Sequence, residues 1–203
     1  RISLSNNDSG TSNTIFGKGA GGSIDAGSNY NVFIGEAVSD ASMNDAIENV
    51  AIGYSAMTGL TEGDNNVAIG SLSAEVLTTG DSNILIGRSS GGGLTTSSNN
   101  IAVGYRALYR ATTQADDNVV IGYNAMSGNF TTADVDDCVV IGSEAVAGTL
   151  TSGAAGTVAI GKSALAALTS GAGNTAVGYT ALSTQTTGGN NTAIGHQSMV
   201  DCN

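Results

Sequence analysis

The sequence contains no proline and no tryptophan among its 203 residues, and only 4% of its residues are aromatic. An ordinary two-layer domain carries more aromatic residues, because these side chains supply much of the bulk of a core. Charged residues make up 11% and hydrophobic residues 40% of the chain. These values exclude a disordered chain, which has dense charge and low hydrophobicity. We therefore expect a thin core made of small and aliphatic side chains.

Positive charge and long apolar runs are also scarce. Six Lys and Arg residues stand against 17 Asp and Glu residues, a formal net charge of −11. Such a surface repels phosphate backbones and anionic lipid headgroups, and no run approaches the ~18 apolar residues of a membrane span. We therefore expect neither a nucleic-acid partner nor direct membrane insertion. The first residues show no initiator Met and no signal-peptide h-region, so we interpret the chain as part of a longer fibre protein.

A short repeat runs through the whole chain instead. The segment Asn49-Val50-Ala51-Ile52-Gly53 returns in eleven related copies, whose glycines are spaced by 17 to 20 residues. We predict a single repeat domain over residues 1–203, because no part of the chain lies outside the repeat. The marker glycines are Gly17, Gly35, Gly53, Gly70, Gly87, Gly104, Gly122, Gly142, Gly161, Gly178 and Gly195.

A period near 17 residues is too short for helical-hairpin repeats, which need ~33 to 47 residues. The positions one and three residues before each glycine hold mostly Val and Ile, which favour strands over helices. Asn precedes this segment in nine of eleven copies, with Cys138 and Thr157 as exceptions, and Asn and Gly are both typical of turns. The pattern predicts an all-β, parallel β-solenoid of about eleven coils, a rod on the order of 50 Å long at ~4.8 Å per coil.

The middle residue of each predicted strand is apolar in every copy. Because alternate residues of a strand point to opposite faces, we expect the Val and Ile columns to point inward and the middle column outward. An outward apolar column indicates a face covered by further copies of the chain. The alternative is that small residues such as Ala are tolerated on the surface of a lone solenoid. The predicted interchain face consists of Phe33, Ala51, Ala68, Leu85, Ala102, Val120, Val140, Ala159, Ala176 and Ala193.

The repeats resemble a known family. Asn-Val-Ala-Ile-Gly-Tyr-Ser-Ala (residues 49–56) and Asn-Asn-Thr-Ala-Ile-Gly (190–195) are similar to the head repeats of YadA-like trimeric autotransporter adhesins and to related repeats of bacteriophage tail fibres and bacterial surface fibres. The resemblance covers all eleven copies, although the adhesin heads repeat near 14 residues. It implies a left-handed β-roll, three chains side by side, and an extracellular location on a cell surface or virion. It further implies a host cell surface or glycan as the partner, and attachment as the function.

Candidate catalytic residues are few. His196 is the sole histidine and follows Gly195 in a column that also holds Tyr, Lys and Ser, which indicates a solvated side chain. No Gly-x-Ser-x-Gly elbow is present, and no long loops could wall a groove with paired carboxylates. We therefore expect no enzymatic activity and no cofactor. The alternatives are a polysaccharide-binding or polysaccharide-degrading solenoid of the tailspike type and, because a Thr column follows the repeats, an ice-binding solenoid.

Three further groups of residues are candidates for binding or cross-linking. The column after the glycines contains four tyrosines that could stack on sugar rings or pack at the corner: Tyr54, Tyr105, Tyr123 and Tyr179. Asp134, Asp136 and Asp137 offer oxygen ligands for Ca²⁺, or else form a solvated corner. Cys138 and Cys202 fall three coils apart, roughly 14 Å, which argues against an intrachain disulfide and leaves pairing between chains open.

Overall fold

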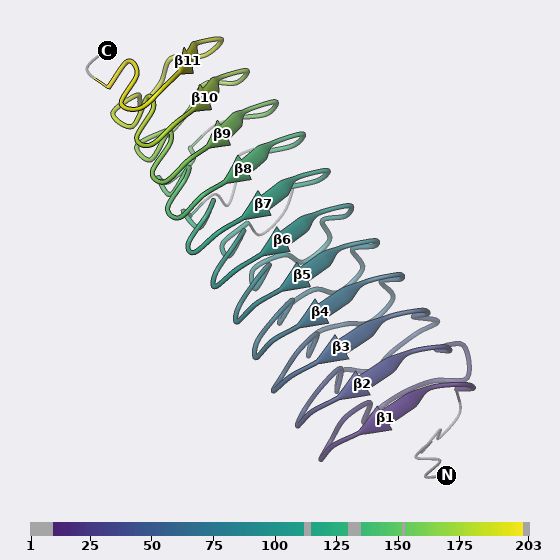
Figure 1. Ribbon diagram of the computed structural model, residues 1–203. Helices are drawn as coiled ribbons and strands as arrows, with labels where there is room; N and C mark the ends of the chain where they lie inside the picture. The colour runs from purple at the N-terminus through teal and green to yellow at the C-terminus, as the bar shows by residue number, and fades with distance from the viewer. Residues whose placement is uncertain (1–9, 112–114, 130–134, 152, 201–203) are drawn as a thin grey trace.

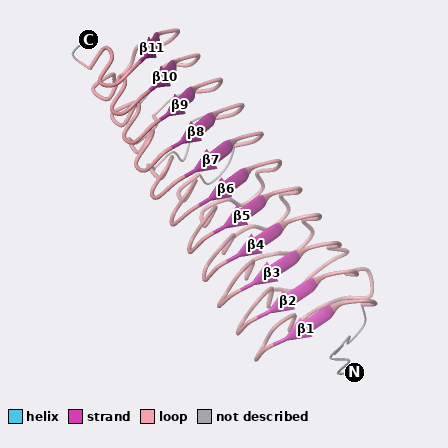
Figure 2. Ribbon diagram, in the orientation of Figure 1, coloured by secondary structure: helices cyan, strands magenta, loops and turns pink. Residues whose placement is uncertain are grey.

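The computed structural model describes residues 10–111, 115–129, 135–151 and 153–200, and it is a parallel β-solenoid of about ten turns (Figure 1). The described residues include eleven three-residue strands and no helix. All strands lie along one side of the rod, while turns and loops close each coil (Figure 2). The strands are β1 (Thr14–Phe16), β2 (Val32–Ile34), β3 (Val50–Ile52), β4 (Val67–Ile69), β5 (Ile84–Ile86), β6 (Ile101–Val103), β7 (Val119–Ile121), β8 (Val139–Ile141), β9 (Val158–Ile160), β10 (Thr175–Val177) and β11 (Thr192–Ile194).

The strands form one sheet in chain order, and every neighbouring pair is parallel. The register keeps equivalent residues of the repeat together, so that Val50 pairs with Val67 and Ala51 with Ala68. The same register pairs Val119 with Val139, although these two residues are further apart in the sequence than Val50 and Val67. The prediction of a parallel β-solenoid is therefore confirmed.

The glycine after each of the strands β1 to β10 is required by the close approach of successive coils. Gly53 has a φ of 138°, and a Cβ atom on it would lie 2.5 Å from the carbonyl oxygen of Gly70. At Gly122 the corresponding distance to the carbonyl oxygen of Gly142 is 2.6 Å. Since no side chain fits between these backbones, only glycine allows the coils to stack at this corner.

The absence of proline follows from the backbone ladder between coils. On β3, the N–H of Val50 donates to the carbonyl oxygen of Asn66 over 2.8 Å, and the N–H of Gly53 donates to that of Ile34 over 2.9 Å. Proline has no N–H group, so it would remove one of these bonds in a central strand.

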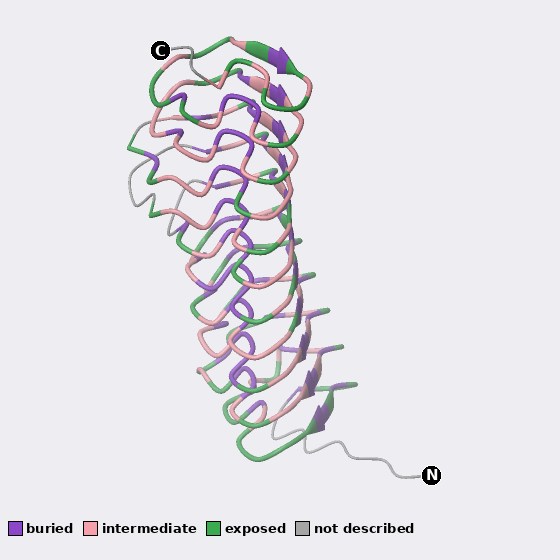
Figure 3. Cartoon of the chain, turned by 60° about the vertical axis from the view of Figure 1, so that its left-hand side comes forward, coloured by how far each residue is buried: buried purple, intermediate pink, exposed green. Residues whose placement is uncertain are grey.

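The predicted orientation of the strand faces was wrong. The middle residues of the strands are buried (Figure 3), whereas the flanking Val and Ile residues contact solvent, so the middle column faces the interior of the coil and the flanking columns face outward. The ten residues predicted as the interchain face are therefore enclosed within their own chain, each with at most 3% of its surface exposed. They are Phe33, Ala51, Ala68, Leu85, Ala102, Val120, Val140, Ala159, Ala176 and Ala193.

The narrow interior of each coil explains this orientation. A middle residue shares the interior with the residue six positions later, and their sizes are complementary in most coils. Leu85 is followed by Gly91, and a Cβ atom on Gly91 would lie only 2.7 Å from a methyl group of Leu85. Phe33 is likewise followed by Ser39, whereas Ala51, Ala102, Ala159 and Ala176 are followed by Met57, Leu108, Leu165 and Leu182, all buried. The β4 coil, with Ala68 and Ala74, and the β8 coil, with Val140 and Val146, do not follow this pattern.

The Asn column forms a buried ladder inside the solenoid rather than a solvated turn. The side-chain amide of Asn66 donates to Oδ1 of Asn49 over 3.1 Å and to the carbonyl oxygen of Gly80 over 2.8 Å, while its backbone N–H donates to the same Oδ1 over 3.0 Å. Equivalent bonds continue through Asn83, Asn100 and Asn118. At Cys138 the thiol replaces the amide, and at Thr157 the hydroxyl is buried without a partner among the described residues.

We expect Asn66→Ala to lower the free energy of unfolding by about 3 kcal/mol, because the substitution leaves the buried backbone N–H of Asn83 and the carbonyl oxygen of Gly80 unpaired. Chemical denaturation of the variant and of Asn129→Ala, which changes an exposed Asn, measures the effect. Equal free energies of unfolding for the two variants would show that the hydrogen bonds of the Asn ladder do not stabilise the protein.

Candidate functional site

The outward face of the sheet is an uncharged strip. We define the aliphatic strip as the first and third residues of the eleven strands, 22 residues in all. Apart from Thr14, Thr175 and Thr192, every member is Val, Ile or Phe. The others are Phe16, Val32, Ile34, Val50, Ile52, Val67, Ile69, Ile84, Ile86, Ile101, Val103, Val119, Ile121, Val139, Ile141, Val158, Ile160, Val177 and Ile194.

Every residue of the strip contacts solvent, some exposed and the others partly buried. Near the middle of the rod, Ile69, Ile84 and Ile86 each leave 36 to 39% of their surface in contact with solvent. The end strands are more exposed, with 60% for Phe16 and 70% for Ile194, because each lacks a neighbour on one side. Eleven rows at ~4.8 Å spacing and about 10 Å width give a flat apolar area on the order of 500 Å². This is at the upper end of what a monomeric protein exposes.

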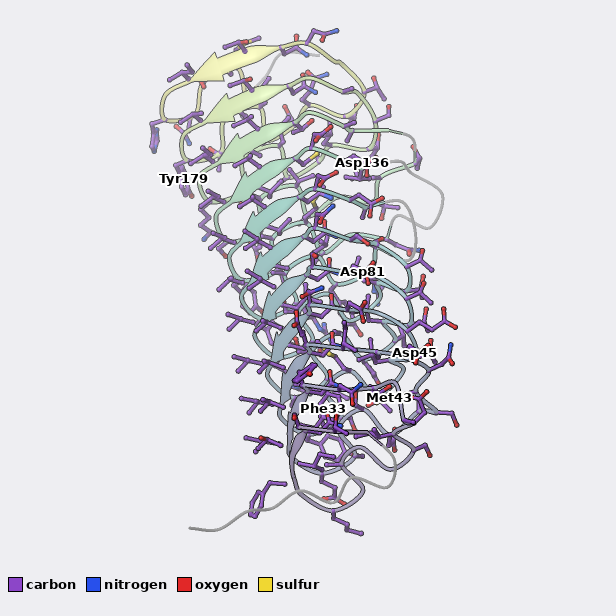
Figure 4. All side chains as sticks on the ribbon, turned by 90° about the vertical axis from the view of Figure 1, so that its right-hand side faces the viewer. Phe33, Met43, Asp45, Asp81, Asp136 and Tyr179 are labelled. Atoms are coloured by element: carbon purple, nitrogen blue, oxygen red, sulfur yellow. The ribbon has the colours of Figure 1, made fainter. Side chains whose placement is uncertain are left out.

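The four predicted tyrosines lie in one column beside the strip. Tyr54, Tyr123 and Tyr179 are exposed, and Figure 4 shows Tyr179 on the flank where the strands end. Tyr105 is half-buried and stacks on Tyr123, with ring centroids 5.4 Å apart. His196 continues the same column by stacking on Tyr179 at 5.2 Å. The column therefore exposes aromatic rings to solvent. His196 is itself exposed, as the sequence predicted.

Three arginines surround Tyr105 of this column and Tyr109 of the same coil, a cluster that the sequence interpretation missed. The guanidinium of Arg106 lies 5.2 Å from the ring centroid of Tyr105 and 4.9 Å from that of Tyr109. Arg88 approaches Tyr105 at 5.9 Å, and Arg110 approaches Tyr109 at 5.8 Å. The signal in the sequence was Tyr-Arg-x-x-Tyr-Arg at residues 105–110, which occurs in a single coil and so does not stand out in the repeat columns.

A group of acidic residues lies on the opposite flank, where Asp45, Asp81 and Asp136 are seen in Figure 4. Several of their carboxylates accept a backbone N–H from the preceding coil. Asp81 accepts from the N–H of Asp64 over 2.7 Å, and Asp136 accepts from that of Asp116 over 2.8 Å. These bonds stabilise the stacking of coils, which is a sufficient reason for acidic residues at this corner.

Two of the three predicted calcium ligands lie in the part of the chain that the structure describes. Asp136 takes part in the acidic ladder, Asp137 is exposed, and Asp134 lies outside the described residues. Among the residues that the structure describes, no three His, Cys, Asp or Glu side chains are placed to hold a metal ion.

The Thr column engages the neighbouring coils. The hydroxyl of Thr78 donates to the carbonyl oxygen of Thr95 over 2.8 Å, and that of Thr169 donates to Thr186 over 2.9 Å. Each of these hydroxyls therefore donates its one hydrogen to the next coil and has no donor left for a ligand. The outward strand columns, where a flat array would face solvent, hold mainly Val and Ile, with Thr only at Thr14, Thr175 and Thr192 among the described strands.

Cys138 is a buried free thiol, while Cys202 lies outside the described residues. Burial raises the pKa of the Cys138 thiol to about 11, helped by the negative charges of Asp136 and Asp137. The neutral thiol therefore stabilises the fold fully below pH 9.0, and this contribution is lost as the pH rises toward 11.

We expect Cys138 to resist alkylation in the native protein at pH 8, because the thiolate is the reactive form. A Cys202→Ser variant leaves one thiol, whose labelling with a thiol reagent is followed with and without denaturant. Labelling should require unfolding. A native rate equal to that of the unfolded chain would contradict the buried, protonated thiol.

No family model, no curated protein and no solved structure matches this chain. The part of the chain that the structure describes also holds no helix long and apolar enough to cross a membrane. The class of protein that fold and surface define is a parallel β-solenoid repeat protein with an exposed aliphatic strip along one side.

Proposed function

We propose that this chain is a structural and adhesive segment of an extracellular fibre, either a bacterial adhesin head or a phage tail fibre, that attaches to a host surface and is not an enzyme. Three chains associate side by side through the aliphatic strip and make a stiff rod. The observation that carries the proposal is the uncharged strip running along every strand of the solenoid. The resemblance of the repeats to adhesin heads and phage fibres supports the same function.

The size of the strip favours a permanent interface. Three strips of ~500 Å² each would bury about 1,500 Å² in a three-chain assembly, within the size range of specific interfaces. Burying one strip contributes about 12 kcal/mol at ~25 cal/mol per Å², which is comparable to the cost of associating two chains.

The most suitable occupant of the strip is another copy of this chain. Its side chains repeat with the ~4.8 Å spacing of the coils, and a partner that meets every row must have the same spacing. A second copy lying parallel satisfies this condition along its full length. The strip has two columns, so one column can contact each of two neighbours around a common axis, which is a three-fold arrangement.

Immunolabelling tests the fibre function in the source organism. Antibody fragments raised against the purified chain are expected to label thin appendages outside cells or virions in electron micrographs, and preimmune fragments provide the control. Labelling confined to the cell interior would overturn the proposal.

A further inference from the structure

The strongest unassigned feature is the cluster of Arg88, Tyr105, Arg106, Tyr109, Arg110 and Tyr123, which we call the arginine–tyrosine patch. It contains three of the six Lys and Arg residues of a chain whose net charge is −11. All three arginines are exposed. Within the described ranges the one ion pair joins Lys18 to Glu36 at 3.6 Å, so these arginines have no carboxylate within 4.0 Å there.

The rings fix the arginines without using their hydrogen-bond donors. A guanidinium group above an aromatic ring is held by the ring face, and its N–H groups stay free at its edge. Arg106 is held in this way by two rings, Tyr105 and Tyr109, at 5.2 and 4.9 Å. The patch therefore presents positioned donors to solvent, which lowers the entropy lost when a ligand binds.

Neighbouring coils extend the patch along the rod. Arg88 belongs to the coil of β5, Tyr105 to that of β6 and Tyr123 to that of β7, so the patch spans about 10 Å at ~4.8 Å per coil. Tyr123 stacks one face on Tyr105 and is itself about half exposed. A ligand of a few sugar units has the length to contact both the ring of Tyr123 and the guanidinium of Arg88.

We infer that the arginine–tyrosine patch binds an acidic carbohydrate whose sugar rings carry carboxylates. Guanidinium groups bind carboxylates through two parallel hydrogen bonds, and tyrosine rings offer flat apolar faces on which sugars stack. The inference rests on the proposed attachment function and names the ligand class for it. The acidic remainder of the surface disfavours long polyanions, whereas a short acidic sugar feels mainly the patch, since the Debye length is ~8 Å at physiological salt.

Isothermal titration of the assembled protein with a trigalacturonate oligosaccharide tests the inference. We expect saturable binding that Arg88→Gln with Arg106→Gln weakens at least tenfold. The matched control, Lys18→Gln with Lys162→Gln, removes the same charge from two exposed cations outside the patch and should change the affinity less than twofold. Tyr123→Ala should weaken binding several-fold, and maltotriose, which has no carboxylate, should not bind. Circular dichroism of each variant verifies the fold.

Three results would overturn the inference: no binding of trigalacturonate by the unaltered protein, equal weakening by the arginine and lysine pairs, or equal affinity for a short oligonucleotide. None of these results affects immunolabelling of fibres or the mass of the assembly. Failure of the patch is therefore distinguishable from failure of the fibre function.

Discussion

Lysine at Ile69, Ile86 and Val103 is expected to dissociate the assembly into single chains. These residues occupy one column of the aliphatic strip in three successive coils. Each side chain already contacts solvent within one chain, so the solenoid itself should remain folded. In an assembly the three ammonium groups would be buried in an apolar interface without partners, which is costly. We expect an association constant at least 100-fold lower in analytical ultracentrifugation.

The matched control places the same three charges outside the strip. Val76, Thr79 and Thr96 are exposed residues of the loops, and their replacement by lysine changes the net charge equally. The control should keep the mass of the unaltered protein, and both variants should keep its circular dichroism. If the strip variant also keeps that mass, the strip is not the interface.

Leu85→Ala is expected to cost about 3 kcal/mol of unfolding free energy, since it leaves a cavity in the narrow interior of the β5 coil. Gly91→Leu alone should also destabilise by about 1 to 3 kcal/mol, because its side chain would meet Leu85. The double variant moves the large side chain from one position to the other, as in the coil of Ala102 and Leu108. The backbone permits this, because Gly91 and Leu108 have φ values of 58° and 52°.

A double-mutant cycle by chemical denaturation measures this exchange. The free energy of unfolding of the double variant should lie within about 1 kcal/mol of that of the unaltered protein. The two substitutions would then be strongly coupled, as expected of residues in contact. Additive losses would show that positions 85 and 91 do not share the same space.

The sequence was sufficient to predict the parallel solenoid, because a 17-residue repeat with β-branched columns and a single glycine leaves few alternatives. The orientation of the strands was mispredicted, since both faces are apolar and hydrophobicity alone cannot distinguish them. Two signals were present. The Asn column lies two residues before the middle residue, so both point to the same face of the strand. In the pairs Leu85–Gly91 and Phe33–Ser39 a large residue is matched by a small one, as expected of residues that share one interior.

The candidate sites were predictable to the extent that they follow the repeat. The tyrosine column could be read from the position after the glycine, and the structure places its four members in one line. The arginine–tyrosine patch was missed because Arg106, Tyr109 and Arg110 have no equivalents in neighbouring coils and meet only through local folding of one corner. The backbone bonds of Asp81 and Asp136 depend on the stacking register, which composition does not show.

Sedimentation equilibrium of the unaltered chain tests the central claim most directly, namely that the aliphatic strip is buried against further copies. The account predicts a species of three times the 19.9 kDa chain mass that persists on dilution to micromolar concentration. A two-chain species would retain the strip as an interface but contradict the three-fold arrangement. A stable single chain at the same concentrations would contradict the claim itself.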